Sequence, residues 1–317
     1  MCIFKILVNK NDYFLTILLK NKMSRHNSDS EKEIVIFNAP RDKTFIDMLN
    51  RVLKRAKIKD EYISKIHDKG GFDLYSQAFT HPTANENVNY ETLEILGDSI
   101  VNCCIVWYLS RRFPQLNCPQ GVKIIARLKI NLVSKKMFAE FGKNLGLWDF
   151  VSADDETRSL RMKKTLEDVF EAFFGATQKL VDENIRMGVG YSICYDLIKS
   201  LFDEIDISLK YEDLYDAKTR LKETFDQYGK NIVDEESGKV TRYGIGQMKW
   251  ENERIDKIQY VQVYRIQQNN PKKKILIGKG SAALKPDAQQ KAAEVALKTL
   301  ARQGYVKDVD EFYKTLC

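Results

Sequence analysis

Hydrophobic positions in the first two hundred residues recur every three to four residues, which is the period of a helix. Six segments carry this pattern, and the third of them stops at Pro114: 44–58, 71–83, 90–113, 121–145, 163–184 and 191–205. The segment 71–83 follows a Gly-Gly break and is expected to end near Pro82. No stretch alternates with period two, so this part of the chain is predicted to be all-helical.

The pattern changes after about Lys210. An amphipathic helix is predicted over 214–229, followed by a polar loop. Three strand-like runs come next, at 240–250, 258–268 and 273–281. A final helix has Pro286 in its first turn, where proline is well tolerated. The fold class is therefore α+β and multidomain, with an all-α domain over 41–206 followed by an α-β-β-β-α domain over 210–305.

Residues 1–40 are predicted to form a flexible extension. The apolar block 13–19 lacks a small-residue cleavage site and is followed by Lys20 and Lys22, so a signal peptide is not expected. Met23 opens a polar stretch typical of disorder and is a possible translation start, which would make 1–22 a leader. No apolar run approaches the length of a membrane span, and no membrane partner is expected.

Charge and cysteine content narrow the class of protein. A net charge of +7 with a pI near 8.9 is a mild preference for polyanions. Six cysteines without a CxxC pair, together with three histidines, do not favour a zinc site. Cys103 and Cys104 lie in an apolar run and are interpreted as reduced core thiols. This usage fits a reducing intracellular compartment, either cytoplasm or nucleus.

The stretch "NYETLEILGDS" (89–99) carries three carboxylates on an otherwise apolar helix. On a helical wheel, Glu91, Glu94 and Asp98 fall within an arc of roughly 60°. The opposite side is apolar and contains Leu93, Leu96, Ile100, Cys104 and Trp107. This arrangement predicts a mostly buried helix with one acidic patch.

A second stretch, "TLEDVFEAFFGA" (165–176), places Asp168 and Glu171 three residues apart among large apolar residues. Burying these carboxylates without a partner is unfavourable. Lysine or arginine partners, exposure to solvent, or a hard divalent cation such as Mg²⁺ would each resolve the problem. No basic residue lies between Glu91 and Asp98 or between Asp168 and Glu171. Two such stretches on helices that can pack together favour the metal.

Three motifs, in order, resemble ribonuclease III. "YETLEILGDS" looks like the signature helix of that family, and "EDVFEAFFGA" resembles its second acidic motif. "AFTHPT" (78–83) is similar to the segment that precedes the signature. The resemblance runs from about residue 44 to 205 and continues into the second domain. It implies an all-helical nuclease domain over the first part.

The resemblance also implies a reaction and a set of residues. Glu94, Asp98, Asp168 and Glu171 match the catalytic, metal-binding quartet, and Glu91 matches the additional glutamate of the signature helix. The implied activity is Mg²⁺-dependent hydrolysis of double-stranded RNA to 5′-phosphate and 3′-hydroxyl ends, with Mn²⁺ as a possible substitute. The metal lowers the pKa of a bound water and stabilises the leaving oxygen. The family usually forms homodimers through the signature helix.

Two departures from the family pattern concern the nuclease domain. Tyr90 stands where many members have asparagine, and Asn89 is one residue earlier. Bacterial members carry a further acid in the loop after the long helix, but 113–128 contains no Asp or Glu and has Val122 near that place. These departures bear on coordinated cutting of the two strands rather than on basal hydrolysis.

The second domain resembles a double-stranded RNA-binding domain, through 216–225 and 277–297. Lys279 and Lys285 lie near a helix N-terminus and are expected to meet phosphates. Glu223 is expected to hydrogen-bond ribose hydroxyls in the minor groove, with Lys222 beside it as a further RNA-binding residue. Pro286 stands where the family usually has a second lysine, and 250–257, taken as the middle loop, has no Gly-Pro-x-His motif.

Two functions from different classes remain open. One is an active endoribonuclease in RNA processing, which retention of the whole quartet favours. The other is a non-catalytic double-stranded RNA-binding protein on the same fold, either a structural component or an antagonist of RNA silencing. The second domain alone is also compatible with protein contacts. The sequence does not separate ribosomal precursors, messenger RNA and foreign duplexes as substrates.

Overall fold

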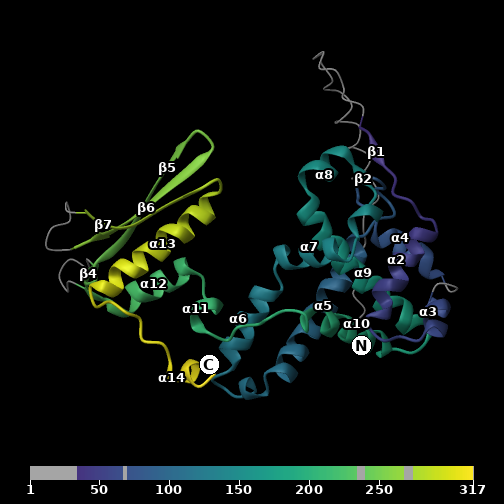
Figure 1. Cartoon of the computed structure of the whole chain (residues 1–317), viewed down its shortest axis with the longest axis horizontal. Coiled ribbons are helices and arrows are strands. Elements are labelled where there is room, and N and C mark those ends of the chain that lie inside the picture. The colour runs from purple at the N-terminus through teal and green to yellow at the C-terminus, as the bar shows by residue number, and fades with distance from the viewer. Residues whose placement is uncertain (1–33, 67–69, 234–239, 268–273, 317) are drawn as a thin grey trace, which may run out of the picture. The chain divides into compact units, whose positions relative to one another are not determined.

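The computed structural model describes residues 34–66, 70–233, 240–267 and 274–316 (Figure 1). Up to residue 202 the regular elements of the described chain are α-helices and two short 3₁₀ turns, apart from the two-residue pair β1 (Ile36–Phe37) and β2 (Ala153–Asp154). The helices are α2 (Lys43–Lys54), α3 (Asp60–Ile66), α4 (Phe72–Ala78), α5 (Glu91–Arg112), α6 (Val122–Leu132), α7 (Lys135–Asn144), α8 (Asp155–Leu160), α9 (Met162–Asn184) and α10 (Val189–Phe202). The expected all-helical domain is confirmed, with the β1–β2 pair as an addition.

Most of the predicted N-terminal extension, including the apolar block 13–19 and the possible start at Met23, lies outside the described residues. At the end of that range, Ile36 and Phe37 pair with β2, and Ala39 is buried. The amide of Ala39 donates a hydrogen bond to Ser152 Oγ at 3.0 Å.

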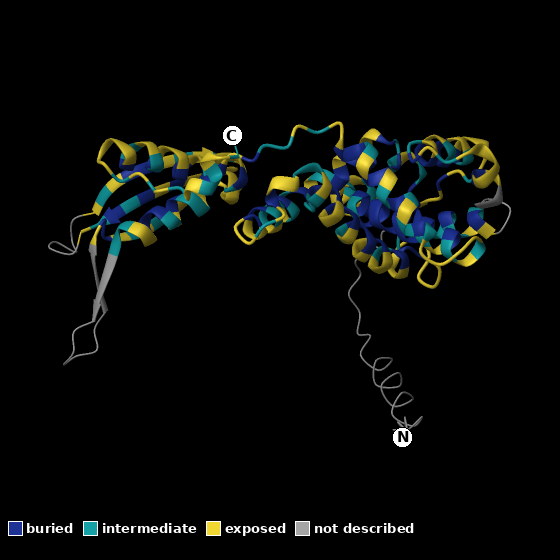
Figure 2. Ribbon diagram, turned by 90° about the horizontal axis from the view of Figure 1, so that it is seen from below, coloured by how far each residue is buried: buried dark blue, intermediate teal, exposed yellow. Residues whose placement is uncertain are grey.

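Helix α9 forms the centre of the first domain, and helices α4, α5, α7 and α10 pack around it. Most of its residues from Thr165 to Thr177 are buried. Figure 2 shows how buried and exposed residues are distributed over the helices. Aromatic rings fill the contact with its neighbours: Phe170 lies 5.0 Å from Phe138 and 5.9 Å from Phe141, between ring centroids. Contacts of this kind add to the stabilisation from apolar burial.

Two of the helix boundaries that differ from the prediction have a local cause. The single helix expected over 121–145 is two helices, because Ser134 adopts an extended conformation and its side chain accepts a hydrogen bond from the Met137 amide at 3.3 Å. Serine is a favoured N-cap residue. Helix α4 ends at Ala78, before Pro82, because Thr80 forms a parallel bridge with Ser152 instead.

Helix α5 is less buried than predicted. Leu96 and Trp107 were assigned to its packed side but are 46% and 52% exposed, and Cys103 is exposed while Cys104 is buried. By length and apolar content, α5 is sufficient to cross a membrane, which corrects the statement that no run approaches that length. Core helices that are partly buried, as α5 is, meet the same criterion, so this is weak support for a span.

The second domain has the predicted α-β-β-β-α order with one addition. Helix α12 (Ala217–Tyr228) precedes the antiparallel sheet β5 (Gln247–Ile255), β6 (Ile258–Ile266) and β7 (Lys274–Ala282), and α13 (Lys285–Arg302) closes it. The addition is a hairpin of β3 (Gly229–Val233) and β4 (Val240–Gly244). The run expected as one strand over 240–250 is divided between β4 and β5. Gly244 and Gly246 have positive φ at this break, a conformation that glycine adopts readily.

The segment 250–257 was interpreted as a middle loop, and that interpretation is wrong. Strand β5 continues to Ile255, which pairs directly with Ile258 at the start of β6. Only two residues, Asp256 and Lys257, connect the strands, and Asp256 has a φ of 54°. Aspartate tolerates this left-handed conformation in tight hairpin turns. No extended loop projects from the described chain at this position.

Helix α13 packs closely on β7 because glycines face alanines. A Cβ on Gly278 would lie 2.2 Å from the Ala292 carbonyl oxygen, and one on Gly280 would lie 2.5 Å from the Ala292 amide. Ala288, Ala292 and Ala296 are fully buried at this contact. The alanine-rich composition of the last helix therefore reflects packing as well as helix propensity.

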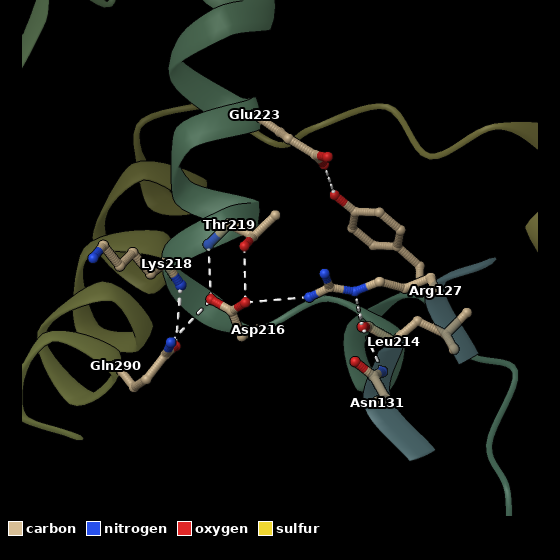
Figure 3. A network of polar contacts seen from close by, with 9 residues as sticks. Arg127, Asn131, Leu214, Asp216, Lys218, Thr219, Glu223 and Gln290 are labelled. Carbon is tan, nitrogen blue, oxygen red and sulfur yellow. Dashed lines mark hydrogen bonds and ion pairs between the residues drawn. The ribbon is translucent and has the colours of Figure 1, made fainter. Parts of the chain in front are cut away.

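A polar network connects α6 to the start of the second domain (Figure 3). Arg127 and Asn131 both donate to the carbonyl of Leu214, at 2.8 and 2.9 Å, at the end of the short helix α11 (Tyr211–Leu214). Arg127 also pairs with Asp216, the N-cap of α12, at 3.3 Å. Burial raises the pKa of Asp216, but hydrogen bonds from Gln290 and Thr219 outweigh it and lower the pKa to about 2.

Candidate active site

The two acidic stretches meet where α5 and α9 make their closest contact. A Cβ on Gly97 would lie 1.7 Å from the carbonyl oxygen of Glu171. A Cβ on Gly175 would lie 2.1 Å from the carbonyl oxygen of Leu93. The two backbones are therefore in direct contact within one helical turn of Glu94 and Asp98. Neither glycine was predicted from the sequence to have this role, although both lie in the quoted motifs.

The five predicted acidic residues differ in burial. Asp168 and Glu171 on α9 are 5% and 7% exposed, whereas Glu91 and Asp98 on α5 are exposed and Glu94 is intermediate. The cluster therefore has a buried side from α9 and an open side from α5. The open side is the one accessible to a large substrate.

Asp168 has two partners in the structure. Tyr90 donates its hydroxyl to Asp168 Oδ2 at 3.0 Å, and Lys164 Nζ lies 3.4 Å from the same oxygen. Lys164 is one helical turn before Asp168. It therefore lies outside the interval from Asp168 to Glu171, which contains no basic residue. The lysine-partner explanation therefore applies to this one carboxylate.

The departure at Tyr90 has a structural role. Tyr90 is 3% exposed, and its burial together with the charge of Asp168 raises its pKa, so the hydroxyl remains a hydrogen-bond donor at neutral pH. It lies directly before α5 and connects that helix to the acidic motif of α9. This contact fixes the orientation of the Asp168 carboxylate.

We expect Tyr90→Phe to lower the cleavage rate about 3- to 10-fold and stability by about 1.5–3 kcal/mol, the usual contribution of a hydrogen bond to a charged group. Single-turnover cleavage and urea denaturation measure the two effects. Tyr108→Phe is the matched control, since Tyr108 on α5 donates to the more exposed Asp203 instead. Equal cleavage by wild type and Tyr90→Phe contradicts a role for this hydroxyl in orienting Asp168.

Glu171 is the buried carboxylate without a counter-charge. No hydrogen bond or ion pair reaches its carboxylate from any residue that the structure describes. Burial, followed by the charges of Asp98 and Glu167, raises the pKa of Glu171 to about 8. Burial and Asp168 likewise raise the pKa of Glu94. The two stretches therefore form one electrostatic cluster with excess negative charge.

Glu167 is a member of this cluster that the sequence analysis missed. Its side chain is 14% exposed, and Lys135 Nζ lies 3.4 Å from its Oε2, which has no hydrogen bond of good geometry. Burial raises its pKa. The available signal was its spacing, since Glu167 lies four residues before Glu171 and so on the same face of α9.

The donor set fits a hard divalent cation. All the groups are carboxylates, whose oxygens suit Mg²⁺ and Mn²⁺. Among the described residues, no three carboxylate, imidazole or thiol groups already converge in a ligating arrangement. Ligation by all four quartet residues would therefore require their side chains to rotate toward one another. The side chains of Glu94 and Asp98 can rotate, because they lie on the less buried helix.

Comparison with known proteins gives the family of the chain. A family profile described as Ribonuclease III domain matches residues 91–178, a range that holds all five predicted acidic residues. The chain is 37% identical over 293 residues to a protein of Invertebrate iridescent virus 6 that has the provisional name ribonuclease 3. The alignment covers 88% of this chain and 95% of the relative. The chain belongs to the ribonuclease III family. It is accordingly an endoribonuclease by type, that is, a phosphodiester hydrolase.

Other similarities extend beyond one virus. A protein of Frog virus 3 with the same provisional name is 36% identical over 256 residues, covering 80% of this ribonuclease III-family chain and 62% of the relative. The solved nuclease domain of ribonuclease III from Campylobacter jejuni is 26% identical over 51% of this chain and 98% of that domain. The TM-score between the two structures is 0.38.

The predicted RNA-binding residues lie outside the matched profile. Lys222 on α12, Lys279 on β7 and Lys285 at the start of α13 are all exposed, as phosphate-binding lysines must be. Glu223 is already engaged within the chain, because it accepts a hydrogen bond from Tyr211 and pairs with Lys307 at 3.3 Å. Their roles toward RNA stay predictions.

Proposed function

We propose that this ribonuclease III-family protein cleaves double-stranded RNA in a Mg²⁺-dependent reaction that leaves 5′-phosphate and 3′-hydroxyl ends. One observation supports this most directly. Glu171 is buried without a partner, at the helix contact that also carries Glu94, Asp98 and Asp168. A buried acid of this kind among other acids is stabilised by a bound cation more than by any residue near it.

The chain's own residues then have separate roles. Glu94, Asp98, Asp168 and Glu171 hold the cation. When bound, it lowers the pKa of a water and stabilises charge on the leaving oxygen. Tyr90 orients Asp168, and Lys164 offsets its charge before the cation binds. Glu171, whose pKa is about 8, releases its proton when the cation binds.

The second domain supplies binding to duplex RNA in this proposal. Lys222, Lys279 and Lys285 contact phosphates, and Glu223 reaches ribose hydroxyls across the minor groove. Recognition of this kind reads the A-form shape more than the base sequence. The domain therefore holds long duplexes without selecting one.

We further propose that the protein acts as a homodimer through α5. Ile95, Leu96 and Trp107 are 69%, 46% and 52% exposed on this helix. Exposed apolar residues on one element are typical of an association surface. Sedimentation of Ile95→Glu as a monomer and of wild type as a dimer would support the proposal.

The deciding experiment is cleavage of a long RNA duplex with and without Mg²⁺, followed by mapping of the ends. We expect cleavage only with the metal, and 5′-phosphate ends with a short 3′ overhang. A single-stranded RNA of the same sequence is the control substrate. A duplex that is bound but not cut with Mg²⁺ would instead support the non-catalytic RNA-binding protein.

A further inference from the structure

The C-terminal segment Tyr305–Leu316, here called the strap, returns along helix α12 after the end of α13. Tyr228 donates its hydroxyl to the carbonyl of Val306. Gln227 and Asp308 form a reciprocal pair: the Gln227 amide donates to Asp308 Oδ2 at 2.9 Å, and the Asp308 backbone amide donates to Gln227 Oε1 at 3.1 Å. The strap is therefore bound to the C-terminal half of α12 through specific hydrogen bonds.

The strap also holds Glu223, one turn before Gln227 on the same face of α12. Lys307 Nζ lies 3.3 Å from Glu223 Oε2 and 5.0 Å from the centroid of the Tyr211 ring. Tyr211, from the short helix α11, donates its hydroxyl to the same Glu223 oxygen. The Glu223 carboxylate is consequently engaged by the strap and by α11.

The far end of the strap contacts α11 and the residue that follows it. Helix α14 (Glu311–Lys314) places Tyr313 with its hydroxyl 3.1 Å from that of Tyr215. The ring of Tyr313 also meets the Tyr211 ring edge-to-face, with centroids 5.6 Å apart. The strap thus has two attachments, one on α12 and one beside α11, and can leave α12 while the second remains.

We infer that the strap and duplex RNA compete for one face of α12. The inference rests on the proposed function, because it takes Glu223 as a ligand of ribose hydroxyls. Glu223 cannot accept from a ribose hydroxyl with the same oxygen that Lys307 and Tyr211 already occupy. Asp308 and Asp310 on the strap also carry negative charge that repels the phosphate backbone. The strap therefore lowers affinity for duplexes until it is released.

The contacts that close the strap are partly exposed, with Lys307 and Glu223 side chains 26% and 32% accessible. Exposed ion pairs and hydrogen bonds contribute little individually, so closure is reversible. If only the open form binds with full affinity, the apparent dissociation constant rises by the inverse of the open fraction, here about 3- to 10-fold.

The test compares the double variant Lys307→Ala/Asp308→Ala with wild type and with Lys179→Ala/Glu183→Ala. The second double variant removes an exposed lysine–glutamate pair on α9 and is the matched charge control. Binding of a blunt RNA duplex of about 20 base pairs, long enough for one RNA-binding domain, is measured in EDTA so that no cleavage occurs. We expect about 3- to 10-fold tighter binding by the strap variant only. Thermal melting of all three proteins checks that they are folded.

Hydrogen exchange gives a second readout on the unmodified protein. Backbone amides of 306–308, the part of the strap bound to α12, are expected to exchange faster when the duplex is bound. Equal affinity of wild type and the strap variant, or unchanged exchange with saturating duplex, overturns the inference. Absence of duplex binding by all three proteins overturns it as well. Failure of the proposed nuclease is distinguishable, because it appears as absent Mg²⁺-dependent cleavage in a separate assay.

Discussion

Glu171→Gln is expected to reduce RNA cleavage by about 10³-fold or more, which corresponds to a loss of about 4 kcal/mol of transition-state stabilisation. Glutamine has nearly the same shape, so the packing of α9 is retained. It cannot carry the negative charge that a divalent cation requires at this buried position. Single-turnover cleavage at saturating Mg²⁺ measures the loss. Glu183→Gln, an exposed residue near the end of the same helix, is the control and should cleave as wild type does.

The Glu171→Gln substitution also changes how the stability of the metal-free protein depends on pH. The pKa of Glu171 is about 8 in the folded protein and 4.5 as a reference value for the unfolded chain. Between these values the folded state binds more protons, so stability of the metal-free protein falls as pH rises from about 5 to about 8. The upper limit of the loss is about 5 kcal/mol, at about 1.36 kcal/mol per pKa unit.

Urea denaturation at several pH values without divalent ions measures this loss. Glu171→Gln should remove most of the slope and should be at least as stable as wild type at pH 8. Equal slopes for the two proteins would contradict the assignment of the raised pKa to Glu171. Intact cleavage by the variant would contradict its role in holding the cation.

Helix boundaries marked by strong local signals were predictable from the sequence. Pro114 ends α5 within one residue of the expected position, and the apolar period of α9 gave both its ends. The break between α6 and α7 was not predictable from periodicity, because Ser134 interrupts the backbone without disturbing the apolar spacing. The two-residue turn at Asp256 was missed because its neighbours are polar and resemble a loop.

The composition of the candidate site was predictable, but its partners were not. A helical wheel placed Glu94 and Asp98 on one face and Asp168 with Glu171 on another. A helical wheel gives only the angular positions of residues around one helix axis. It does not show which side chains from other elements contact that helix. Lys164 lies one residue before the stretch 165–176, and the Tyr90 hydroxyl reaches Asp168 from the other quoted stretch, which a wheel of α9 alone does not contain. The exposure of Leu96 was missed for the same reason, since the wheel does not show which neighbours are present.

Gly97→Ala is expected to have the largest effect on folding, although alanine favours helices by about 1 kcal/mol over glycine. The added methyl would lie 1.7 Å from the Glu171 carbonyl oxygen and 2.4 Å from its carbonyl carbon, so two helix backbones must separate. We expect a loss of about 3 kcal/mol or more, at the upper end of overpacking effects. Because a misplacement of about 1 Å costs about 10²-fold in rate, cleavage should fall further than the folded fraction does.

Gly142→Ala is the matched control for this prediction. Gly142 is also helical, on α7, but the nearest atom to an added Cβ is Leu166 Cδ2 at 3.1 Å, the end of a side chain that can rotate. This variant should retain cleavage and change stability by no more than about 1 kcal/mol. Denaturation midpoints and single-turnover cleavage rates of the two variants measure these effects on stability and activity. If Gly97→Ala is as stable and active as Gly142→Ala, the acidic stretches are not joined through direct contact of the α5 and α9 backbones. The cation cluster would then require another geometry.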